Sequence, residues 1–395
     1  MSQFVRSLPK SFGLTLLLLL IACAAASSQR GTQTGAPELG RVRNLLEKGE
    51  QDSAIKVSRK AIADPVTDLN TLLQLGQLLA EHQILPEARA AFTRVLERTP
   101  RSFPAAYNLG YAYFQEGNLE QARKSLARSV DLDPASPQAN LLLGIILVRL
   151  DKKHEGLLQL QKTERLDPHN VELLKLLAMQ YSAAGMHKEA LASLRRALAV
   201  AGADQNLYIL LVESYRRAAD FQGALEAASE AIQKFPNSSR MNFLLGVRLQ
   251  ALGRLPESRQ YFQKSVSLDP NFADGYIALG ELARRYGKSQ EAVSLLQKAL
   301  ALRPDYPDAL LELAKDYKDL GDFGSAEQAL IAAVHKDPEN PTPHLLLSQI
   351  YSAQKNLDKS EKERQIFLEL KQRAASHPSA VSGQRAGAPE PSDDK

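Results

Sequence analysis

The feature that most constrains this chain of 395 residues is a helix terminator that returns every 34 residues. It is proline at seven positions and glycine once, at Gly202, and Pro65 precedes the series one residue out of register. A fixed period of this length indicates a repeat architecture, in which each unit packs only on its neighbours. A long chain of this kind need not divide into ordinary globular domains. The seven prolines are Pro100, Pro134, Pro168, Pro236, Pro270, Pro304 and Pro338.

Other positions keep the same register. A small residue preceded by leucine, such as Gly110 after Leu109, lies 24 residues before the terminator in most repeats. Tyrosine or leucine follows three residues later, and alanine then precedes leucine or phenylalanine by four residues, as in Ala122 and Leu126. This pattern resembles the tetratricopeptide repeat, although the tryptophan of that family is absent.

The resemblance implies two antiparallel helices per repeat and an all-α fold, a right-handed α-solenoid of about ten 34-residue repeats. We expect the solenoid to span residues 38–373, with full repeats from residue 69 and a degenerate repeat before them. Glycines between the helices, such as Gly117 and Gly287, are expected to supply a positive φ at the helix end. Ser136, Asn170 and Ser238 are expected to cap the first helices.

The N-terminus reads as an export signal. Arg6 and Lys10 precede an apolar run that is too short for a comfortable membrane span. The run ends in Leu-Ile-Ala-Cys at Cys23, which resembles the lipobox of bacterial lipoproteins. That resemblance implies a signal peptide at 1–22, lipidation of Cys23, and a location facing the periplasm in a bacterial envelope.

Three further expectations concern the ends of the chain. Ala24 follows the cysteine where the lipoprotein family's inner-membrane retention signal would be Asp, so outer-membrane anchoring is expected. The alternatives to cleavage before Cys23 are cleavage after Ala26 and retention of the apolar segment as an uncleaved membrane anchor. Residues 23–37 are predicted to be a flexible tether and residues 374–395 a disordered tail, because both are poor in residues that a core could bury.

Composition excludes several function classes. Lys plus Arg number 49 against 45 Asp plus Glu, without a clustered basic face, so nucleic acid is not expected as a partner. No histidine pair has the spacing of a helical metal site, and the single cysteine cannot contribute a second ligand. Phosphate-binding loops and nucleophile elbows are also absent from the sequence. We therefore expect neither an enzyme nor a cofactor, metal or small-molecule substrate.

The resemblance implies a binding groove along the first helices of the repeats. The residues expected to line it are aromatic in the N-terminal part and mainly basic in the C-terminal part, so the expected ligand has an apolar and an acidic portion. The alternative is that the aromatic rings pack on neighbouring repeats and the charges only keep the surface soluble. The candidate residues are Tyr107, Asn108, Tyr111, Phe114, Arg149, Lys175, Arg216, Arg217, Arg240, Arg284 and Arg285.

These expectations favour a non-enzymatic scaffold that binds a protein or peptide partner and assists assembly of an envelope complex. An accessory subunit that recruits enzymes of glycan or polysaccharide synthesis or export is the alternative. Asn108 resembles the groove asparagine of some tetratricopeptide domains, but the equivalent positions Gln74, Leu142, Leu176 and Leu210 do not complete a clamp for a terminal carboxylate.

Overall fold

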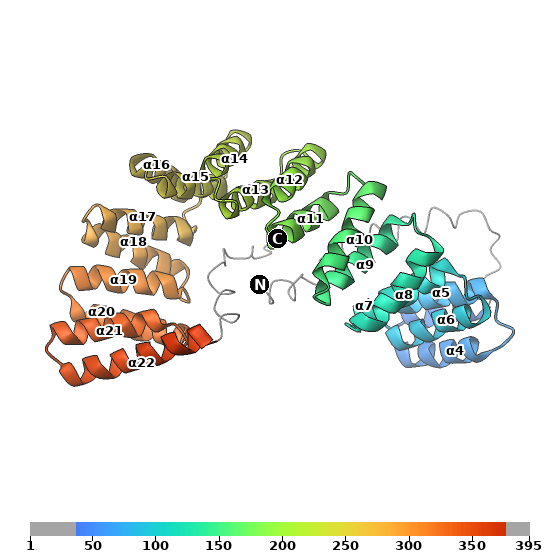
Figure 1. Cartoon of the computed structure of the whole chain (residues 1–395). Coiled ribbons are helices and arrows are strands. Elements are labelled where there is room, and N and C mark those ends of the chain that lie inside the picture. The colour runs from blue at the N-terminus through green and yellow to red at the C-terminus, as the bar shows by residue number, and fades with distance from the viewer. Residues whose placement is uncertain (1–36, 377–395) are drawn as a thin grey trace. The chain divides into compact units, whose positions relative to one another are not determined.

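The computed structural model describes residues 37–376, which form helices joined by short turns (Figure 1). Cys23, the predicted signal peptide at 1–22 and almost all of the predicted tether lie outside the described residues. Helix α22 extends to Ser376, and the rest of the predicted tail also lies outside them.

The helices follow one another in pairs, one pair per repeat. The first helices are α3 (Pro37–Glu47), α5 (Leu69–Glu81), α7 (Phe103–Gln115), α9 (Pro137–Arg149), α11 (Val171–Ala183), α13 (Gln205–Arg217), α15 (Ser239–Ala251), α17 (Ala273–Arg285), α19 (Pro307–Asp319) and α21 (Pro341–Ala353). The second helices are α4 (Gln51–Ala63), α6 (Leu85–Arg98), α8 (Leu119–Leu132), α10 (Lys153–Leu166), α12 (His187–Ala201), α14 (Phe221–Lys234), α16 (Leu255–Leu268), α18 (Ser289–Leu302), α20 (Phe323–Lys336) and α22 (Leu357–Ser376). The predicted fold class, an all-α solenoid of about ten helical repeats, is confirmed.

Polar side chains start the first helices where the sequence predicts. The hydroxyl of Ser136 accepts a hydrogen bond from the backbone N–H of Ala139, and Pro137 occupies the first helical position. Asn170 and Ser238 cap α11 and α15 in the same way. Each cap satisfies a backbone donor that the first helical turn leaves without an intrahelical partner.

The turn within each repeat requires a left-handed backbone conformation. Gly117, at the end of α7, has φ 78°, and glycines at the same register position end α11, α15, α17 and α19. Four repeats adopt this conformation without glycine, at Gln83, Asp151, Ala219 and Lys355, with φ between 56° and 61°. The register therefore imposes the turn even where the side chain opposes it.

A small residue of the first helix lies against a large residue of the second helix. A Cβ at Gly76 would lie 2.6 Å from the ring of Phe92, and one at Gly144 would lie 2.8 Å from Cδ2 of Leu160. Gly110, Gly246 and Gly280 face Leu126, Phe262 and Leu296 in the same way. In the repeat 205–238 the two sizes are reversed. The first helix has the larger residue, Val212, the second helix has the smaller one, Ala228, and both are buried. Helix spacing thus depends on the combined size of each pair.

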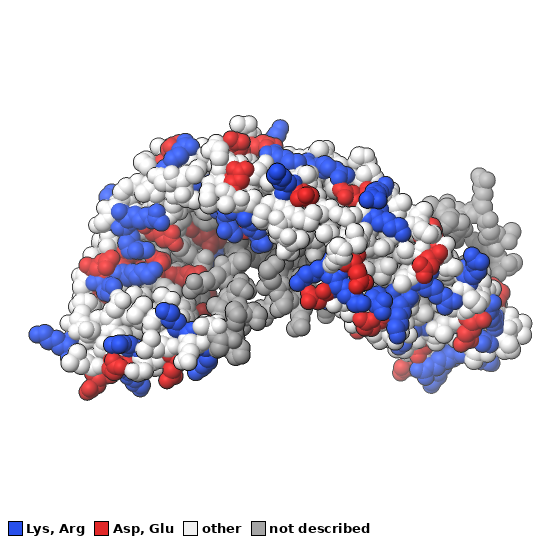
Figure 2. Space-filling model, in the orientation of Figure 1, with Lys and Arg blue, Asp and Glu red and all other residues white. Residues whose placement is uncertain are grey.

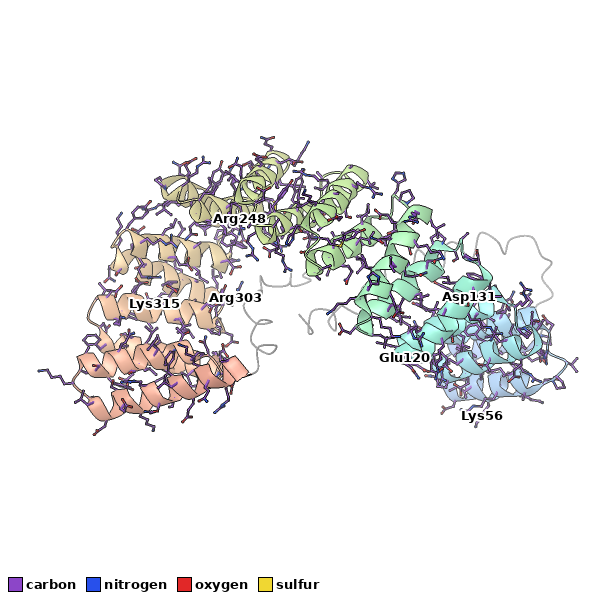
Figure 3. All side chains as sticks on the ribbon, viewed as in Figure 1. Lys56, Glu120, Asp131, Arg248, Arg303 and Lys315 are labelled. Atoms are coloured by element: carbon purple, nitrogen blue, oxygen red, sulfur yellow. The ribbon has the colours of Figure 1, made fainter. Side chains whose placement is uncertain are left out.

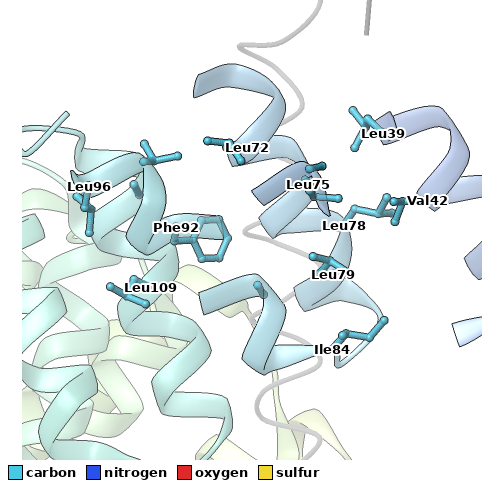
Figure 4. Close-up of a cluster of buried hydrophobic side chains, with 14 of the residues drawn as sticks. Leu39, Val42, Leu72, Leu75, Leu78, Leu79, Ile84, Phe92, Leu96 and Leu109 are labelled. Atoms are coloured by element: carbon cyan, nitrogen blue, oxygen red, sulfur yellow. The ribbon is translucent and has the colours of Figure 1, made fainter. Parts of the chain in front are cut away.

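The helices divide into two compact units, with the boundary between Val200 and Ala201. In the N-terminal unit, Phe92 of α6 packs among Leu75 of α5 and Leu109 of α7 (Figure 4). In the C-terminal unit, a comparable cluster joins α19, α20 and α21 through Leu311, Leu330 and Leu347. Within each unit a second helix packs on its own first helix and on the next one. No helix in the range 37–376 is long and apolar enough to cross a membrane.

We expect Gly144→Leu to destabilise the protein more than Gly287→Ala. The first substitution forces a side chain into the contact with Leu160, and overpacking costs about 1–3 kcal/mol or more. The second affects only a turn with φ 70° and open space around it, at a cost of about 1 kcal/mol. Thermal unfolding followed by circular dichroism measures both effects.

Gly324→Ala is the matched control, because its Cβ would meet only Asp322 Oδ1, at 3.8 Å, and alanine favours the helix. Equal losses for Gly144→Leu and Gly287→Ala would contradict the assigned packing.

Candidate functional site

The predicted groove residues lie on first helices and divide between the two units. Tyr107, Asn108, Tyr111, Phe114, Arg149 and Lys175 belong to α7, α9 and α11 of the N-terminal unit. Arg216, Arg217, Arg240, Arg284 and Arg285 belong to α13, α15 and α17 of the C-terminal unit. First helices of neighbouring repeats contact one another, as α7 contacts α9 and α17 contacts α19. Each unit therefore presents its own row of first-helix side chains.

In the N-terminal unit the aromatic residues pack between repeats. Tyr107, Tyr111 and Phe114 are half-buried against the apolar cluster that α7, α8 and α9 share. The ring of Tyr107 stacks on Phe103 with centroids 6.0 Å apart. Burial raises the pKa of the Tyr107 hydroxyl, which has no hydrogen-bond partner. Part of each ring therefore packs between repeats, as in the alternative in which the aromatic residues contact neighbouring repeats, and the rest faces the surface.

Polar atoms without partners mark the ends of three first helices in this unit. They are Oε1 of Gln115 on α7, Nε of Arg149 on α9 and Oγ of Ser182 on α11, and all three atoms are buried. The guanidinium of Arg149 lies 4.9 Å from the centroid of the Phe114 ring, and burial lowers its pKa. Asn108 and Lys175 are half-buried, and Lys175 Nζ lies 3.0 Å from Glu172 Oε1.

In the C-terminal unit two of the predicted arginines are paired within their own helix. Arg216 Nη2 lies 2.5 Å from Glu213 Oε1, and Arg217 Nε lies 3.2 Å from the same oxygen. Burial acts to raise the pKa of Glu213, but hydrogen bonds from the two arginines outweigh it and hold the pKa below the usual value. A partner carboxylate would have to compete with Glu213 for both arginines.

Arg284 pairs across repeats. Its guanidinium bonds to Glu312 on α19, and its Nε lies 3.9 Å from Oδ1 of Asp316 on the same helix. Lys315 Nζ also binds Glu312, at 2.5 Å from Oε1. Arg285 is exposed and Arg240 is half-buried. Positive and negative side chains are consequently interspersed over α17–α19 rather than forming a patch of one sign (Figure 2).

Two charged residues that the sequence reasoning missed occupy a position that five other repeats fill with buried apolar side chains and two fill with Gln180 and Ser214. Arg248 of α15 and Asp316 of α19 lie in register with Leu78, Ala112, Ile146, Leu282 and Ile350. Arg248 and Lys315 both lie on first helices of the C-terminal unit (Figure 3). A charge at a register position that the other full repeats leave uncharged was the signal that could have found both residues.

Asp316 is the most unusual of these groups. Its side chain is 0% exposed, and neither carboxylate oxygen has a hydrogen-bond partner. Burial raises its pKa to about 7, although Arg284 acts in the opposite direction. Burial, followed by the charge of Glu312, also raises the pKa of the neighbouring Glu281. Among residues 37–376 no group of His, Cys, Asp and Glu could hold a metal ion.

Family models identify the repeat. The model of the cilia and flagella-associated protein 70 C-terminal domain, which describes tetratricopeptide repeats, matches residues 22–242, more than half of the chain. The chain belongs to this tetratricopeptide-repeat family. General tetratricopeptide-repeat models match residues 239–272, 283–333 and 317–363 of the same protein. No curated protein matches this chain.

Several solved structures are similar to this tetratricopeptide-repeat protein. A crystal structure of MamA is 26% identical, covers 42% of this chain and 97% of its own, and has a TM-score of 0.39. MamA from Desulfovibrio magneticus RS-1 is 20% identical, with coverages of 42% and 95% and a TM-score of 0.39. The Cut9–Hcn1 hetero-tetramer of the APC/C is 17% identical, with coverages of 75% and 58% and a TM-score of 0.43. Likenesses this distant carry no argument about partners. The tetratricopeptide scaffold itself is typical of protein–protein interaction.

We expect the stability of the C-terminal unit to fall as pH rises through about 7. The folded-state pKa of Asp316 is above its unfolded value, so its contribution is present at low pH and is lost on ionisation. Asp316→Asn should flatten this dependence by about 2 kcal/mol between pH 5 and pH 8. Amide hydrogen exchange of α17–α19 measures it. Glu226→Gln, which changes an exposed acid on α14, is the control, and a pH profile that Asp316→Asn leaves unchanged would contradict the assignment.

Proposed function

We propose that this tetratricopeptide-repeat protein is a scaffold that binds a segment of a partner protein along its first helices. The observation that carries the proposal is that, among the described residues, the buried side-chain polar atoms without partners lie on first helices, apart from Nε of Arg94 on α6. In the N-terminal unit they include atoms of Gln115, Arg149 and Ser182, and in the C-terminal unit atoms of Arg248, Arg284 and Asp316. Buried polar groups are normally hydrogen-bonded, so a row of exceptions suggests that a ligand supplies the missing partners.

The charges of the C-terminal unit narrow the kind of ligand. Arg216 and Arg217 share the single carboxylate of Glu213, and Arg284 pairs with Glu312, so all three already have a partner within the chain. Among the described residues, Arg240, Arg248 and Arg285 have no ion pair, so these three are the better candidates for recognising an acidic side chain of the partner. Arg240 and Arg248 are half-buried. Truncation of such partly desolvated arginines is a common cause of large losses of affinity at interfaces.

We expect groove variants to lose the partner while second-helix variants keep it. Arg149→Ala with Lys175→Ala tests the N-terminal unit, and Arg248→Ala with Arg285→Ala tests the C-terminal unit. The matched control is Lys124→Ala with Lys264→Ala, which removes two exposed cations from second helices α8 and α16. Quantitative mass spectrometry of proteins captured from an extract of the native organism compares them, after circular dichroism has shown equal helicity.

A loss of about tenfold or more in capture by either groove variant is expected, since each removed contact is worth about 1 kcal/mol or more. Full capture by both groove variants, together with loss in the second-helix control, would assign binding to the second-helix face and contradict the proposal.

The proposal includes export and attachment to a membrane through Cys23, with outer-membrane sorting as the expected fate. Its support is the basic and apolar sequence of residues 1–22 followed by the lipobox-like Cys23. Two or three acyl chains would hold the protein stably, because each buried methylene contributes about 0.8 kcal/mol.

Cys23→Ala is expected to abolish incorporation of labelled palmitate and to release the protein into the soluble fraction. Cys23→Ser keeps a polar side chain of similar size and is expected to behave like Cys23→Ala, because it lacks the sulfur. Equal labelling of the variants and the wild type, or a mature N-terminus at Ser27, would contradict lipidation.

A further inference from the structure

Two carboxylates on neighbouring first helices of the C-terminal unit lack a close cation. Glu281 of α17 is half-buried, makes no ion pair among the described residues, and accepts a hydrogen bond from Gln250 of α15. Asp316 of α19 is fully buried, and its nearest cationic atom is Nε of Arg284, at 3.9 Å. A buried carboxylate without a hydrogen-bond partner is costly, so Asp316 requires an explanation.

The cations nearby are already engaged by a third carboxylate. Glu312 holds both the guanidinium of Arg284 and, at 2.5 Å, Nζ of Lys315. Lys318 donates a hydrogen bond to Gln349 of α21, with Nζ 3.1 Å from Oε1. Glu281 and Asp316 therefore both lie near a satisfied ion pair, and both oxygens of Asp316 remain without a hydrogen-bond partner.

The charged surroundings differ along the unit. Helices α13 and α15 carry Arg216, Arg217, Arg240 and Arg248 against the single acid Glu213. Helices α17 and α19 add Glu281, Glu312, Asp316 and Asp319 around Arg284, Arg285 and Lys315. The acidic end of the row is the one with unused acceptors, and the basic end is the one with a half-buried Arg248 that has no ion pair among the described residues.

We propose that the α17–α19 end of this groove holds a lysine or arginine side chain of the bound segment, with Glu281 as the contacting carboxylate and Asp316 as the buried negative charge behind it. The inference rests on the proposed function, since it concerns the same groove. It adds that an acidic residue of the segment lies toward α15 and a basic residue toward α17. Packed helices are about 8–10 Å apart, which is about three residues of extended chain.

Binding of the basic side chain is coupled to the release of protons from these carboxyl groups. Burial and the charge of Glu312 raise the pKa of Glu281, and burial raises the pKa of Asp316 to about 7. A cation beside them favours the ionised forms, so binding releases protons near neutral pH. Affinity for a basic segment accordingly rises as pH increases from about 6 to about 8.

The test uses the full chain and a defined probe. Peptide amides of sequence Glu-Glu-Leu-Ala-Arg and Glu-Glu-Leu-Ala-citrulline, each labelled with fluorescein on the N-terminal amine, differ only in the positive charge. Fluorescence anisotropy measures their binding to the wild type, Glu281→Gln, Asp316→Asn and the control Glu369→Gln, which alters an exposed acid of α22. We expect the arginine peptide to bind the wild type and the control about tenfold more tightly than the citrulline peptide. Glu281→Gln should abolish the preference, and Asp316→Asn should reduce it and weaken its pH dependence.

Equal binding of the two peptides, or an absence of binding by the arginine peptide, would overturn this inference. Glu281→Gln keeps the shape of the side chain, and its helicity is checked, so loss of preference cannot be confused with unfolding. If the preference is absent while the Arg248→Ala, Arg285→Ala variant still loses the native partner, the groove binds without a cation site and only this inference fails. If neither groove variant loses the partner, the proposed function fails instead.

Discussion

The close contact between a small residue of each first helix and a large residue of the second is the interaction on which the rest of the structure depends. Gly110 against Leu126 and Gly76 against Phe92 leave no room for a Cβ. This spacing between the two helices of a repeat determines where the first helix of the next repeat packs. It therefore determines which side chains of neighbouring first helices lie close together. A groove residue such as Arg284 reaches Glu312 of the next repeat only because these backbone distances recur.

Much of the fold follows from the sequence because each repeat uses local signals. Prolines, capping residues such as Ser136, and turn glycines act within a few residues, so spacing alone predicts them. The positive φ at Ala219 was not predictable from its own identity, because the packing of its repeat imposes it. The candidate site was predictable only in outline. The row of first-helix residues follows from the register, but the pairing of Arg284 with Glu312 depends on distances between helices.

Ion pairs within the chain change the interpretation of the arginines along the first helices. A list of arginines suggests an acid-binding surface, whereas Arg216 and Arg217 share Glu213, and Arg284 is held by Glu312. A partner carboxylate must therefore compete with Glu213 or Glu312 for these arginines. Among the groups left without a hydrogen-bond partner is a carboxylate, Asp316, whose charge at an otherwise uncharged register position could have been found from sequence.

The most direct test of the packing constraint is a double-mutant cycle in the inverted repeat, with Val212→Gly, Ala228→Leu and their combination. Ala228→Leu alone overpacks the contact with Val212 and should cost about 1–3 kcal/mol. Val212→Gly alone opens a cavity and weakens the helix at a similar cost. The double variant restores the glycine–leucine pair that other repeats use, so its loss in the free energy of unfolding should be smaller than the sum by about 1 kcal/mol or more. Losses that simply add would show that the two residues do not set the helix spacing together.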